Sequence, residues 1–479
     1  MRFRINDSFR IIMLVLVLCS AQLIILSANT GQPVAVHDNS NKTAAIVETY
    51  QYPRISPRAE GFKFKANNKE VFVYQSTAGP FAAFSCSGTV NIEVEVPRGT
   101  QNISISPKRL GIEPLLEGSV ISFQLPGPTL LAVMAEGLPL LYIYANPLEH
   151  NKPDPSDPKV KYFKGGQIYE VDQLVLKDDE TLYIEGGAVV RGSVFSSSSN
   201  NVRVAGYGVL DGSFYENYER RRSILFENVR QSVIEDIIMI EPTSWMITLG
   251  LCEDVTVRNV KQLGYVSTSD GVDIVGSRRI RVLDSFLRNG DDCVAIKSFD
   301  FRRYDKHATM DYSSDVEDIE VRGNILIAYK GGHAFEIGHE LTTDSVSNIR
   351  FVDNDVLGVH DMGGVFGINN SDRVIVSNIL YEDIRVEHYY NKLINLRVIK
   401  SRFSTDEQRG QIRDVTFRNI DVTVSRYNPG YSVSFIGGYD ENHTVERVTF
   451  DNFILGGTKV TNADQLDLFT KQVKDIIFK

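Results

Sequence analysis

The sequence predicts an all-β protein in two parts, a parallel β-helix preceded by a small β-sandwich. A phrase of alternating apolar residues, then Asn or Asp, then a second apolar run recurs from about residue 163 onward, as in DVTVRNVKQL and RIRVLDSFL. Its base spacing of 22 to 25 residues suits one coil of three short strands. No stretch shows sustained apolar residues at helical spacing.

Residues 1–28 are expected to be an export signal. Arg2, Arg4 and Arg10 precede an apolar run and the small residues Ser27 and Ala28. The apolar run of 16 residues is marginal for a membrane anchor. We therefore expect a secreted, periplasmic or cell-surface protein with no transmembrane segment after signal removal.

Residues 45–150 are expected to form the β-sandwich. Short alternating runs such as EVFVYQ, NIEVEV and PLLYIYA are separated by Gly, Pro and Asn turns, which predicts antiparallel strands. The segment HNKPDPSDPK resists both helix and strand, so we place a linker at 151–162. The cysteines of the mature chain, Cys86, Cys252 and Cys293, are expected to be buried free thiols.

Residues 163–479 are expected to form the β-helix. Each coil stacks on the next about 4.8 Å away, so residues one period apart become neighbours. The intervals between successive phrases are 22, 25, 39, 30 and 25 residues, and the longer ones indicate loop insertions. The first apolar residues of these phrases are Val233, Val255, Ile280, Ile319, Ile349 and Val374.

The composition is that of an ordinary globular protein, with 42% apolar and 23% charged residues. A formal net charge of -10 argues against a nucleic-acid partner, because such proteins need positive fields to neutralise phosphate. Basic runs at 220–222, 278–279 and 302–303 fit either solvated faces or a groove for an anionic polymer.

Asp270 lies 21 residues before Asp291, which is followed by Asp292. This interval is close to one coil, so the three carboxylates should lie on adjacent rungs. Stacked carboxylates repel one another, and packing does not explain them. They suit glycosidic hydrolysis, in which one acid protonates the leaving oxygen, one base activates water, and a third carboxylate keeps the donor protonated. Calcium binding and an exposed structural face also fit this spacing.

The motifs SDGVDI, NGDDCVAIKS and GGHAFEIGHE resemble motifs of the polygalacturonases and their relatives in glycoside hydrolase family 28. SDGVDI stands where that family has Asn-Thr-Asp-Gly-Ile-Asp, NGDDCVAIKS matches its Gly-Asp-Asp-Cys-Ile-Ala-Ile-Lys-Ser block, and GGHAFEIGHE stands for its Gly-His-Gly-Ile-Ser-Ile-Gly loop. SWMITLGLCEDVTVRNV and GYGVLDGS are similar to two further coils of that family. The resemblance covers roughly residues 163–460 and implies a right-handed parallel β-helix of the pectin-lyase-like type and an inverting mechanism.

The resemblance also implies roles for individual residues. Asp291 would be the general acid, while Asp270 and Asp292 position and deprotonate the water. His333 would tune the protonation of the acid and hold the sugar, and Lys297 would bind substrate. The mechanism requires no metal or organic cofactor.

Two departures from the family pattern concern the substrate. Gly367-Ile368-Asn369 stands where the family has the Arg-Ile-Lys run that binds the galacturonate carboxylate. Arg397 and Lys400 lie on a later coil, and their spacing predicts that they face opposite sides of a strand. No Asn precedes Asp270; Thr268 and Ser269 stand there.

Further candidates are weaker. Arg302, Arg303 and Tyr304 lie in an insertion and are either subsite residues or part of a solvated loop. Trp245 is expected to contact sugar, although core packing is the usual role of such a ring. Tyr265 and Tyr329 have the same two interpretations, and Asp273 is expected to be structural.

The sequence thus predicts a monomeric inverting glycoside hydrolase acting on a pectic or other uronate-containing polysaccharide. A β-sandwich before a β-helix is also the plan of the dextran-cleaving relatives in glycoside hydrolase family 49, so a neutral or sulfated polysaccharide is an alternative substrate. Two further functions fit the same fold, a calcium-dependent polysaccharide lyase and a non-catalytic carbohydrate-binding β-helix.

Overall fold

The computed structural model describes residues 45–303, 305–424 and 433–479. The expected signal at 1–28 and the candidate Tyr304 lie outside these ranges. The described chain is dominated by strands, and none of its helices has the length and apolar character needed to cross a bilayer. Its helices are single 3-10 turns: η1 (Lys108–Leu110), η2 (Gly212–Phe214), η3 (Asn217–Glu219), η4 (Phe301–Arg303) and η5 (Asp464–Leu466).

The N-terminal strands form two sheets that enclose one apolar core. The six-stranded sheet contains β1 (Ile46–Thr49), β4 (Val73–Ser76), β5 (Gly79–Ser87), β7 (Ser104–Ser106), β10 (Thr129–Met134) and β11 (Leu141–Pro147). The five-stranded sheet contains β2 (Lys63–Ala66), β3 (Lys69–Val71), β6 (Val90–Glu95), β8 (Leu115–Glu117) and β9 (Val120–Leu125).

One pairing of this sandwich differs from the expected antiparallel arrangement. Strands β5 and β11 pair in parallel. Both strands are buried along nearly their whole length, which is the setting in which parallel pairing is usual. The alternating runs in the sequence predicted the strands but not the direction of this pair.

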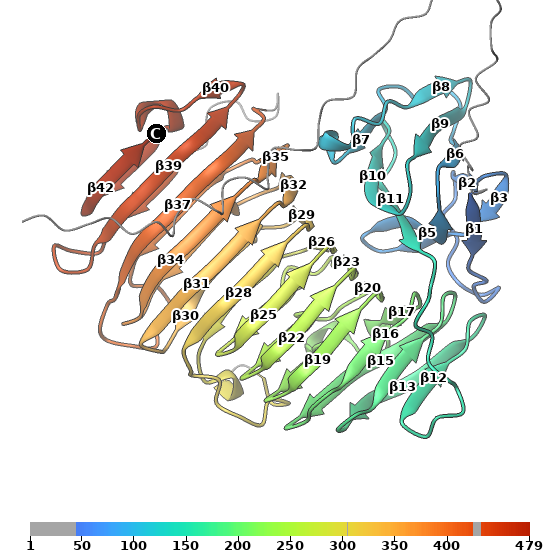
Figure 1. Cartoon of the computed structure of the whole chain (residues 1–479), viewed down its shortest axis with the longest axis horizontal. Helices are drawn as coiled ribbons and strands as arrows, with labels where there is room; N and C mark the ends of the chain where they lie inside the picture. The colour runs from blue at the N-terminus through green and yellow to red at the C-terminus, as the bar shows by residue number, and fades with distance from the viewer. Residues whose placement is uncertain (1–44, 304, 425–432) are drawn as a thin grey trace, which may run out of the picture. The chain divides into compact units, whose positions relative to one another are not determined.

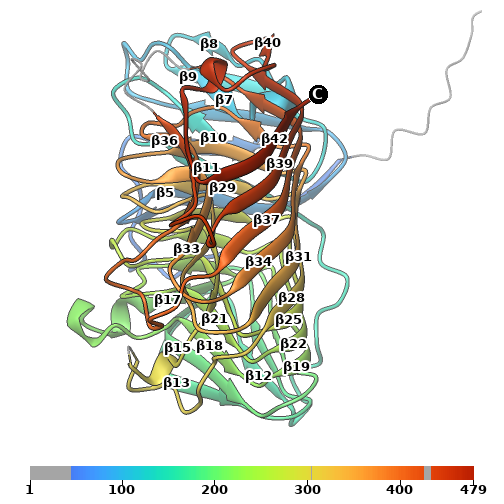
Figure 2. The same ribbon diagram turned by 90° about the vertical axis from the view of Figure 1, so that its left-hand side faces the viewer.

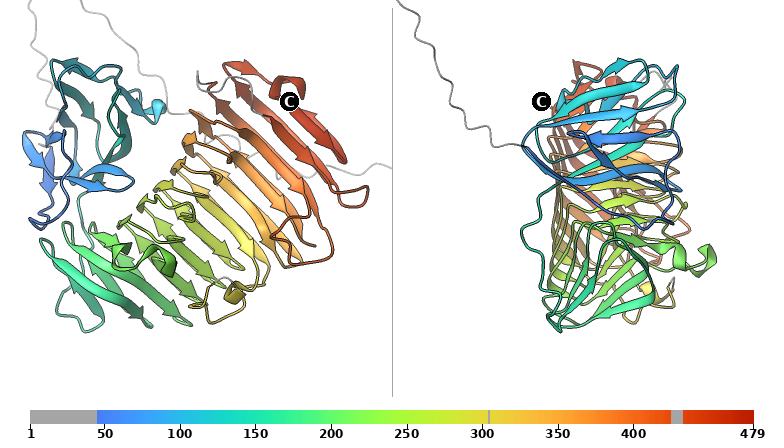
Figure 3. Two further views of the ribbon diagram at one scale, coloured as in Figure 1. Left: turned by 180° about the vertical axis from the view of Figure 1, so that it is seen from behind. Right: turned by 90° about the vertical axis from the view of Figure 1, so that its right-hand side faces the viewer.

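The rest of the chain is a right-handed parallel β-helix, whose sheet of 31 strands in the described ranges runs in chain order from β12 to β42 (Figure 1). The strands remain side by side when the molecule is viewed from the side and from behind (Figures 2 and 3). In most coils each strand pairs with the strand three further along the chain, so every coil contributes one strand to each of three faces.

The face that carries the candidate site comprises β18 (Ile224–Glu227), β21 (Ile247–Gly250), β24 (Val272–Val275), β27 (Val294–Ser298), β30 (Phe335–Leu341), β33 (Gly364–Asn370), β36 (Lys392–Val398), β38 (Ser434–Gly437) and β41 (Leu468–Lys471). The face with the longest strands comprises β12 (Val160–Phe163), β14 (Thr181–Ile184), β16 (Arg203–Ala205), β19 (Arg230–Glu235), β22 (Glu253–Arg258), β25 (Arg278–Leu283), β28 (Val316–Arg322), β31 (Ser345–Val352), β34 (Ile375–Glu382), β37 (Gln411–Val422), β39 (Val445–Leu455) and β42 (Val473–Phe478). The third face comprises β17 (Val209–Asp211), β20 (Ile238–Ile240), β23 (Lys261–Leu263), β26 (Phe286–Asn289), β29 (Ile325–Ala328), β32 (Asp355–Val359) and β35 (Arg385–Val386). Strands β13 (Ile168–Leu176) and β15 (Val189–Ser197) bend across two faces, and β40 (Thr458–Lys459) pairs antiparallel with β39.

The Asn or Asp of the recurring phrase forms the tight corner between two faces. Residues at this corner adopt a positive φ, which Asn and Asp tolerate better than other non-glycine residues. Their side chains also bond from coil to coil, as in the 2.7 Å bond from Asn259 Nδ2 to Asp236 Oδ1. The corner residues with positive φ include Asp236, Asn259, Asp284, Asp353, Asp383, Asn419 and Asn452.

The register expected from the apolar phrases holds in the centre of the β-helix. Ile280 pairs with Ile319, and Ile319 pairs with Ile349. At the two ends the expected anchors are wrong. Val233 pairs with Thr256 rather than Val255, and Ile349 pairs with Ile379 rather than Val374. The first apolar residue of a phrase does not fix the register, because Val233 faces outward while buried Ser232 lies opposite Val255, and Val374 precedes β34.

The interior of the later coils contains a column of parallel rings. Neighbouring ring centroids lie 4.8 to 5.1 Å apart with interplanar angles of 7° to 10°, which matches the spacing of the strands that carry them. This column consists of Phe351, Tyr381, Phe417, Phe450 and Phe478. The thiols of Cys86, Cys252 and Cys293 are free and buried, as expected.

The chain between the sandwich and the β-helix contains no strand from residue 148 to residue 159. Residues 44–479 group as one compact unit. The division into a sandwich domain, a linker at 151–162 and a β-helix domain therefore stays a prediction.

Candidate active site

The β-helix register brings Asp270, Asp292 and His333 onto three successive coils, each just before a strand of the same face. The N–H of Gly271 donates to Asp292 O at 2.8 Å, and the N–H of Cys293 donates to His333 O at 2.9 Å. The coils approach closely here because Gly332 has no side chain; a Cβ at this position would collide with the Asp291 carbonyl.

Asp292 is held by His333. The His333 N–H donates to Asp292 Oδ1 at 2.6 Å, and the ring Nδ1 lies 3.4 Å from the same oxygen. Burial alone raises the pKa of Asp292, but the hydrogen bond and charge of His333 and the charge of Lys297 outweigh it and hold that pKa below its usual value. Asp292 is therefore ionised at neutral pH.

Asp291 has the opposite shift. Its side chain is partly buried, and burial together with the negative charge of Asp292 raises the pKa of Asp291 to about 7, against the opposing charges of Lys297 and His333. Two consecutive carboxyl groups thus have pKa values pushed apart, so that one holds a proton under conditions where the other does not.

Asp270 and Asp273 complete what we call the acidic cluster, Asp270, Asp273, Asp291 and Asp292. Both are buried, and burial followed by the charges of neighbouring aspartates raises their pKa values well above the usual range. Asp270 Oδ1 and both carboxylate oxygens of Asp273 have no hydrogen-bond partner among the described residues. Sequence reasoning left Asp273 outside the site, because its part in the cluster depends on burial.

Lys297 is the central cation of the acidic cluster. Its Nζ lies 3.6 Å from Glu340 Oε2 and 5.1 Å from the centroid of the Trp245 ring. Burial alone lowers the pKa of Lys297, but the charges of Glu340, Asp270 and Asp292 raise it well above the usual value. The structure thus places Lys297 and Trp245 with the acids.

The two arginines nominated from the insertion do not reach the acidic cluster through any contact among the described residues. Arg302 bonds Asp300 at 2.7 Å within its own exposed loop, and Arg303 lies exposed beside it. The insertion meets the site through the buried Phe301, which stacks on Trp245 at 5.1 Å.

Arg222 is a further cation that sequence reasoning did not select from its basic run. It is buried with its Cζ 5.0 Å from the ring centroid of Trp245. Burial lowers its pKa, while the charges of Asp305, Asp273 and Asp270 oppose that shift. Among the three arginines at 220–222, Arg222 is distinguished by its burial, which the sequence pattern does not predict.

Glu336 is a site residue that the sequence did not reveal. It is buried, its Oε2 lies 3.3 Å from His333 Nδ1, and its Oε1 accepts from Asn369 Nδ2 at 2.8 Å. Burial and the charge of Asp292 raise the pKa of Glu336 to about 7, against the charge of His333. In turn the pKa of His333, which burial lowers, is raised overall by Glu336 and Asp292.

Gly367 is the register partner of Glu336. A Cβ at Gly367 would overlap Glu336 Oε2 and crowd the ring of His333. The bare backbone also lets Asn395, one coil later, approach His333 Nε2 at 3.3 Å. The space beside Gly367, where the resemblance to polygalacturonases predicts an arginine side chain, is therefore occupied by a carboxylate and an amide.

The described residues contain no group of three or more His, Cys, Asp or Glu side chains with the geometry of a metal site. The chemistry that the site offers is a proton donor, an ionised carboxylate beside it, and a buried lysine and histidine that stabilise that ionisation.

Comparison with known proteins gives the family. Among curated proteins, Polygalacturonase QRT2 of Arabidopsis thaliana is 24% identical over 258 residues, which cover 47% of this chain and 52% of that protein. A polygalacturonase of Juniperus ashei is 24% identical over 211 residues, covering 43% of this chain and 38% of that protein. The chain thus spans about half the length, or less, of these relatives.

Among solved structures, Dex49A from Penicillium minioluteum superimposes with a TM-score of 0.60 at 12% identity, covering 88% of this chain and 96% of that chain. That likeness concerns the fold alone. Residues 191–467 match the family described as "Glycosyl hydrolases family 28", which is more than half of the 479 residues. The chain therefore belongs to glycosyl hydrolases family 28.

Proposed function

We propose that this protein hydrolyses glycosidic bonds of a pectic or other uronate-containing polysaccharide with inversion at the anomeric carbon. The observation that carries the proposal is the pair Asp291 and Asp292, adjacent carboxyl groups whose pKa values are shifted in opposite directions. Glycoside hydrolysis by an acid and a base needs such a pair.

In this mechanism Asp291 gives its proton to the glycosidic oxygen as the bond to the anomeric carbon breaks. A water molecule attacks that carbon from the opposite face, and Asp292 takes the proton that the water loses. Asp270 offers an oxygen that no described protein group occupies, which suits it to orient the water. His333 and Lys297 keep Asp292 ionised, so it is ready to act as the base.

Binding of several sugar units is supported by the surface before Asp270. A cavity of about 520 Å³ is lined by Tyr265, Ser267 and Lys330, among others. Lys330 Nζ lies 3.8 Å from the centroid of the Tyr265 ring, and this ring is partly exposed. A flat ring next to a cation suits the apolar face and the charged substituent of a uronate sugar.

The relatives named polygalacturonases support a uronate substrate, while the missing Arg-Ile-Lys run leaves a neutral or sulfated polysaccharide as the second candidate. A screen of plant and algal polysaccharides with reducing-end detection, run with the Asp291→Asn variant beside the parent, tests the proposal. We expect turnover of at least one uronate polymer by the parent and loss of turnover in the variant. The anomeric configuration of the first product tests inversion.

Two results of the same screen would replace the proposal. Products that absorb in the near ultraviolet, together with loss of activity on chelation, would indicate a lyase. Retained binding without turnover by the parent on every polymer would indicate a carbohydrate-binding protein. We also propose that residues 1–28 direct export and that the mature protein acts as a monomer; N-terminal sequencing of the secreted protein and light scattering test these points.

A further inference from the structure

The strand β36 presents polar side chains outward at the position one coil beyond Gly367 and Asn369. Asn395 pairs with Gly367 in the register, and Arg397 pairs with Asn369. The neighbours Leu396 and Val398 belong to the apolar interior, so Asn395 and Arg397 face the other way. Arg397 therefore lies one rung beyond the place where the family pattern has its lysine.

Arg397 is connected to His333 through two intervening side chains. Its Nε and Nη2 donate to Asn369 Oδ1 at 3.1 and 2.8 Å, Asn369 Nδ2 donates to Glu336 Oε1 at 2.8 Å, and Glu336 Oε2 lies 3.3 Å from His333 Nδ1. This line fixes the guanidinium on the same face as the acidic cluster. Two of its N–H groups donate to one amide oxygen, and the others make no hydrogen bond within the part of the chain that the structure describes.

Neither Arg397 nor Lys392 of the same strand has a carboxylate within ion-pair distance among the described residues. Lys392 Nζ donates instead to the carbonyl of Met362 at 2.8 Å. Burial lowers the pKa of both groups; the charge of Glu336 opposes this shift at Arg397, and the charge of Arg397 lowers the pKa of Lys392 further. Two partly buried cations without a direct ion pair are unfavourable on their own and gain most from an incoming anion.

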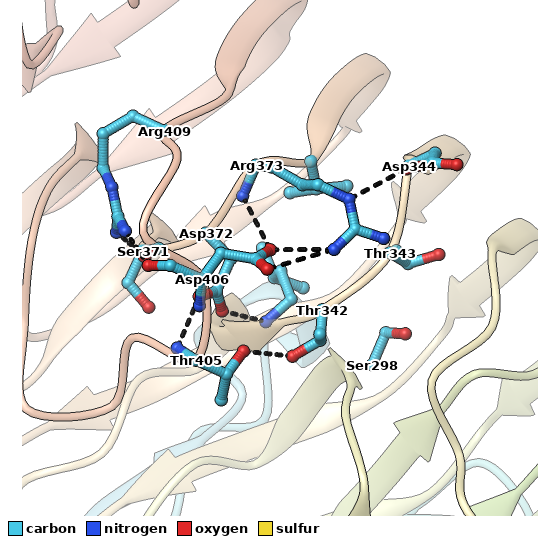
Figure 4. Close-up of polar contacts among 12 residues, drawn as sticks. Ser298, Thr342, Thr343, Asp344, Ser371, Asp372, Arg373, Thr405, Asp406 and Arg409 are labelled. Atoms are coloured by element: carbon cyan, nitrogen blue, oxygen red, sulfur yellow. Dashed lines mark hydrogen bonds and ion pairs between the residues drawn. The ribbon is translucent and has the colours of Figure 1, made fainter.

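The segment that follows β36 is fastened to the preceding coil (Figure 4). The carboxylate of Asp372 accepts from the N–H groups of Thr405 at 2.6 Å and Asp406 at 2.8 Å, and Arg373 pairs with Asp406 at 3.0 Å. Phe403 of this segment lies against His339 of β30, with ring centroids 5.0 Å apart. The segment that follows Arg397 in the chain is thereby fastened to the coils that carry His339 and Asp372.

We propose that Arg397, assisted by Lys392, binds the anionic substituent of a sugar unit next to the bond that is cleaved. The inference rests on the proposed function for its setting and deepens it by naming the residues that recognise the charged substituent. The planar guanidinium favours a uronate carboxylate, since it can offer two parallel N–H groups to the two carboxylate oxygens. Arg397 on the next coil would thus replace the arginine and lysine that the family pattern has at positions 367 and 369.

The test measures binding in the Asp291→Asn background by calorimetry, so that turnover does not interfere. The probes are polygalacturonate, the same polymer with its carboxyl groups reduced to alcohols, and a sulfated galactan. Loss of one charge-assisted contact should make Arg397→Gln bind polygalacturonate about 10- to 100-fold more weakly. Binding of the reduced polymer should change little. Thermal unfolding of each variant establishes that it is folded.

Lys400→Gln is the matched control, because Lys400 is exposed and its nearest carboxylate is Glu407 at 3.9 Å. It removes the same charge three residues away and should leave all three affinities unchanged. Lys392→Gln is the second variant, and it should weaken polygalacturonate binding in the same direction. A larger loss on the sulfated galactan than on polygalacturonate would identify the anion as a sulfate rather than a carboxylate.

The inference is overturned if Arg397→Gln binds polygalacturonate and the sulfated galactan as tightly as its background does, or if the background has no preference for charged over reduced polymer. Failure of the proposed function has a different signature. In that case the parent shows no hydrolysis, or the Asp291→Asn variant keeps full turnover, whatever the charge preference.

Discussion

The Glu336 carboxylate fills the space beside the backbone of Gly367, its register partner on the next coil. The Glu336 carboxylate occupies the volume that a side chain at position 367 would need, and it can do so because Gly367 has no side chain. Glu336 contacts His333 and Asn369, so this arrangement links the acidic cluster to the following coils. A change at either position is therefore expected to depend on the residue at the other.

Gly367→Arg should destabilise the protein by about 1–3 kcal/mol, because the new side chain overlaps the Glu336 carboxylate in a packed site. The double variant Glu336→Ser with Gly367→Arg should recover part of that loss, because the overlap with Glu336 is relieved while the crowding of the His333 ring remains. Urea unfolding of the two single variants and the double variant measures the coupling. Additive losses would show that the two positions are independent.

Asp291→Asn should lower kcat by about 10²- to 10⁴-fold, since the amide has no proton to donate to the leaving oxygen. Substrate affinity should be nearly unchanged. Steady-state kinetics and calorimetry on the same polysaccharide provide the two values. Asp300→Asn is the control, because Asp300 pairs with Arg302 in the exposed loop and should keep parental turnover.

The activity should fall as the pH rises through about 7, because Asp291, whose pKa is raised to about 7, loses its proton there. On the acid side, activity should be lost only below the usual aspartate pKa of 3.8. The pKa of Asp292 is lowered, so this base remains ionised in mild acid. A kcat/KM profile against pH tests both limbs. Replacing His333 by Gln should move the acid limb upward; a profile that stays flat across pH 7 contradicts the assignment of Asp291.

Lys261→Met should raise the free energy of unfolding at neutral pH. Lys261 is fully buried with no ion pair among the described residues, its Nζ donates to Asp236 O at 3.0 Å, and burial lowers its pKa to about 7. Between pH 7 and the usual lysine value of 10.5 the unfolded chain binds more protons, so the parent should gain stability as pH rises through this window.

The expected gain from Lys261→Met is on the order of 2 kcal/mol at pH 7 and below, after allowance for the lost hydrogen bond, and it should shrink toward pH 10. Thermal or urea unfolding at a series of pH values measures it. Lys164→Met, at an exposed position, is the control and should show no such pH dependence. A Lys261→Met variant that is less stable than the parent at every pH would contradict this account.

The sequence predicted the part of the fold that depends on local pattern. The alternation of apolar residues and the Asn or Asp at each corner predicted the coils. The spacing of the recurring phrase correctly predicted that Ile280, Ile319 and Ile349 lie in one register. The errors at Val233 and Val374 arose because Val233 points outward, where a buried Ser232 takes the interior position, and because Val374 precedes β34. The parallel pairing of β5 with β11 depends on long-range contacts, and the alternation of apolar and polar residues does not indicate the direction of pairing.

For the site, the 21-residue interval correctly predicted that the Asp270 coil lies beside the Asp292 coil. It did not predict Glu336, Asp273 or Arg222, because an isolated acid or arginine in a strand has no distinguishing pattern. Their importance comes from burial and from neighbours on adjacent coils. Arg397 was predicted to lie on a later coil, but its line of contacts to His333 appears only when the register is known.

Ile280 and Ile319 pair directly although 39 residues separate them, because the insertion at 299–315 leaves the ladder at one coil and rejoins it in register. The length of a loop between two coils therefore does not change the register in which those coils pair. Loops of new length can therefore be inserted at such junctions, by evolution or by an engineer, while the coil register that brings the acidic cluster together stays constant.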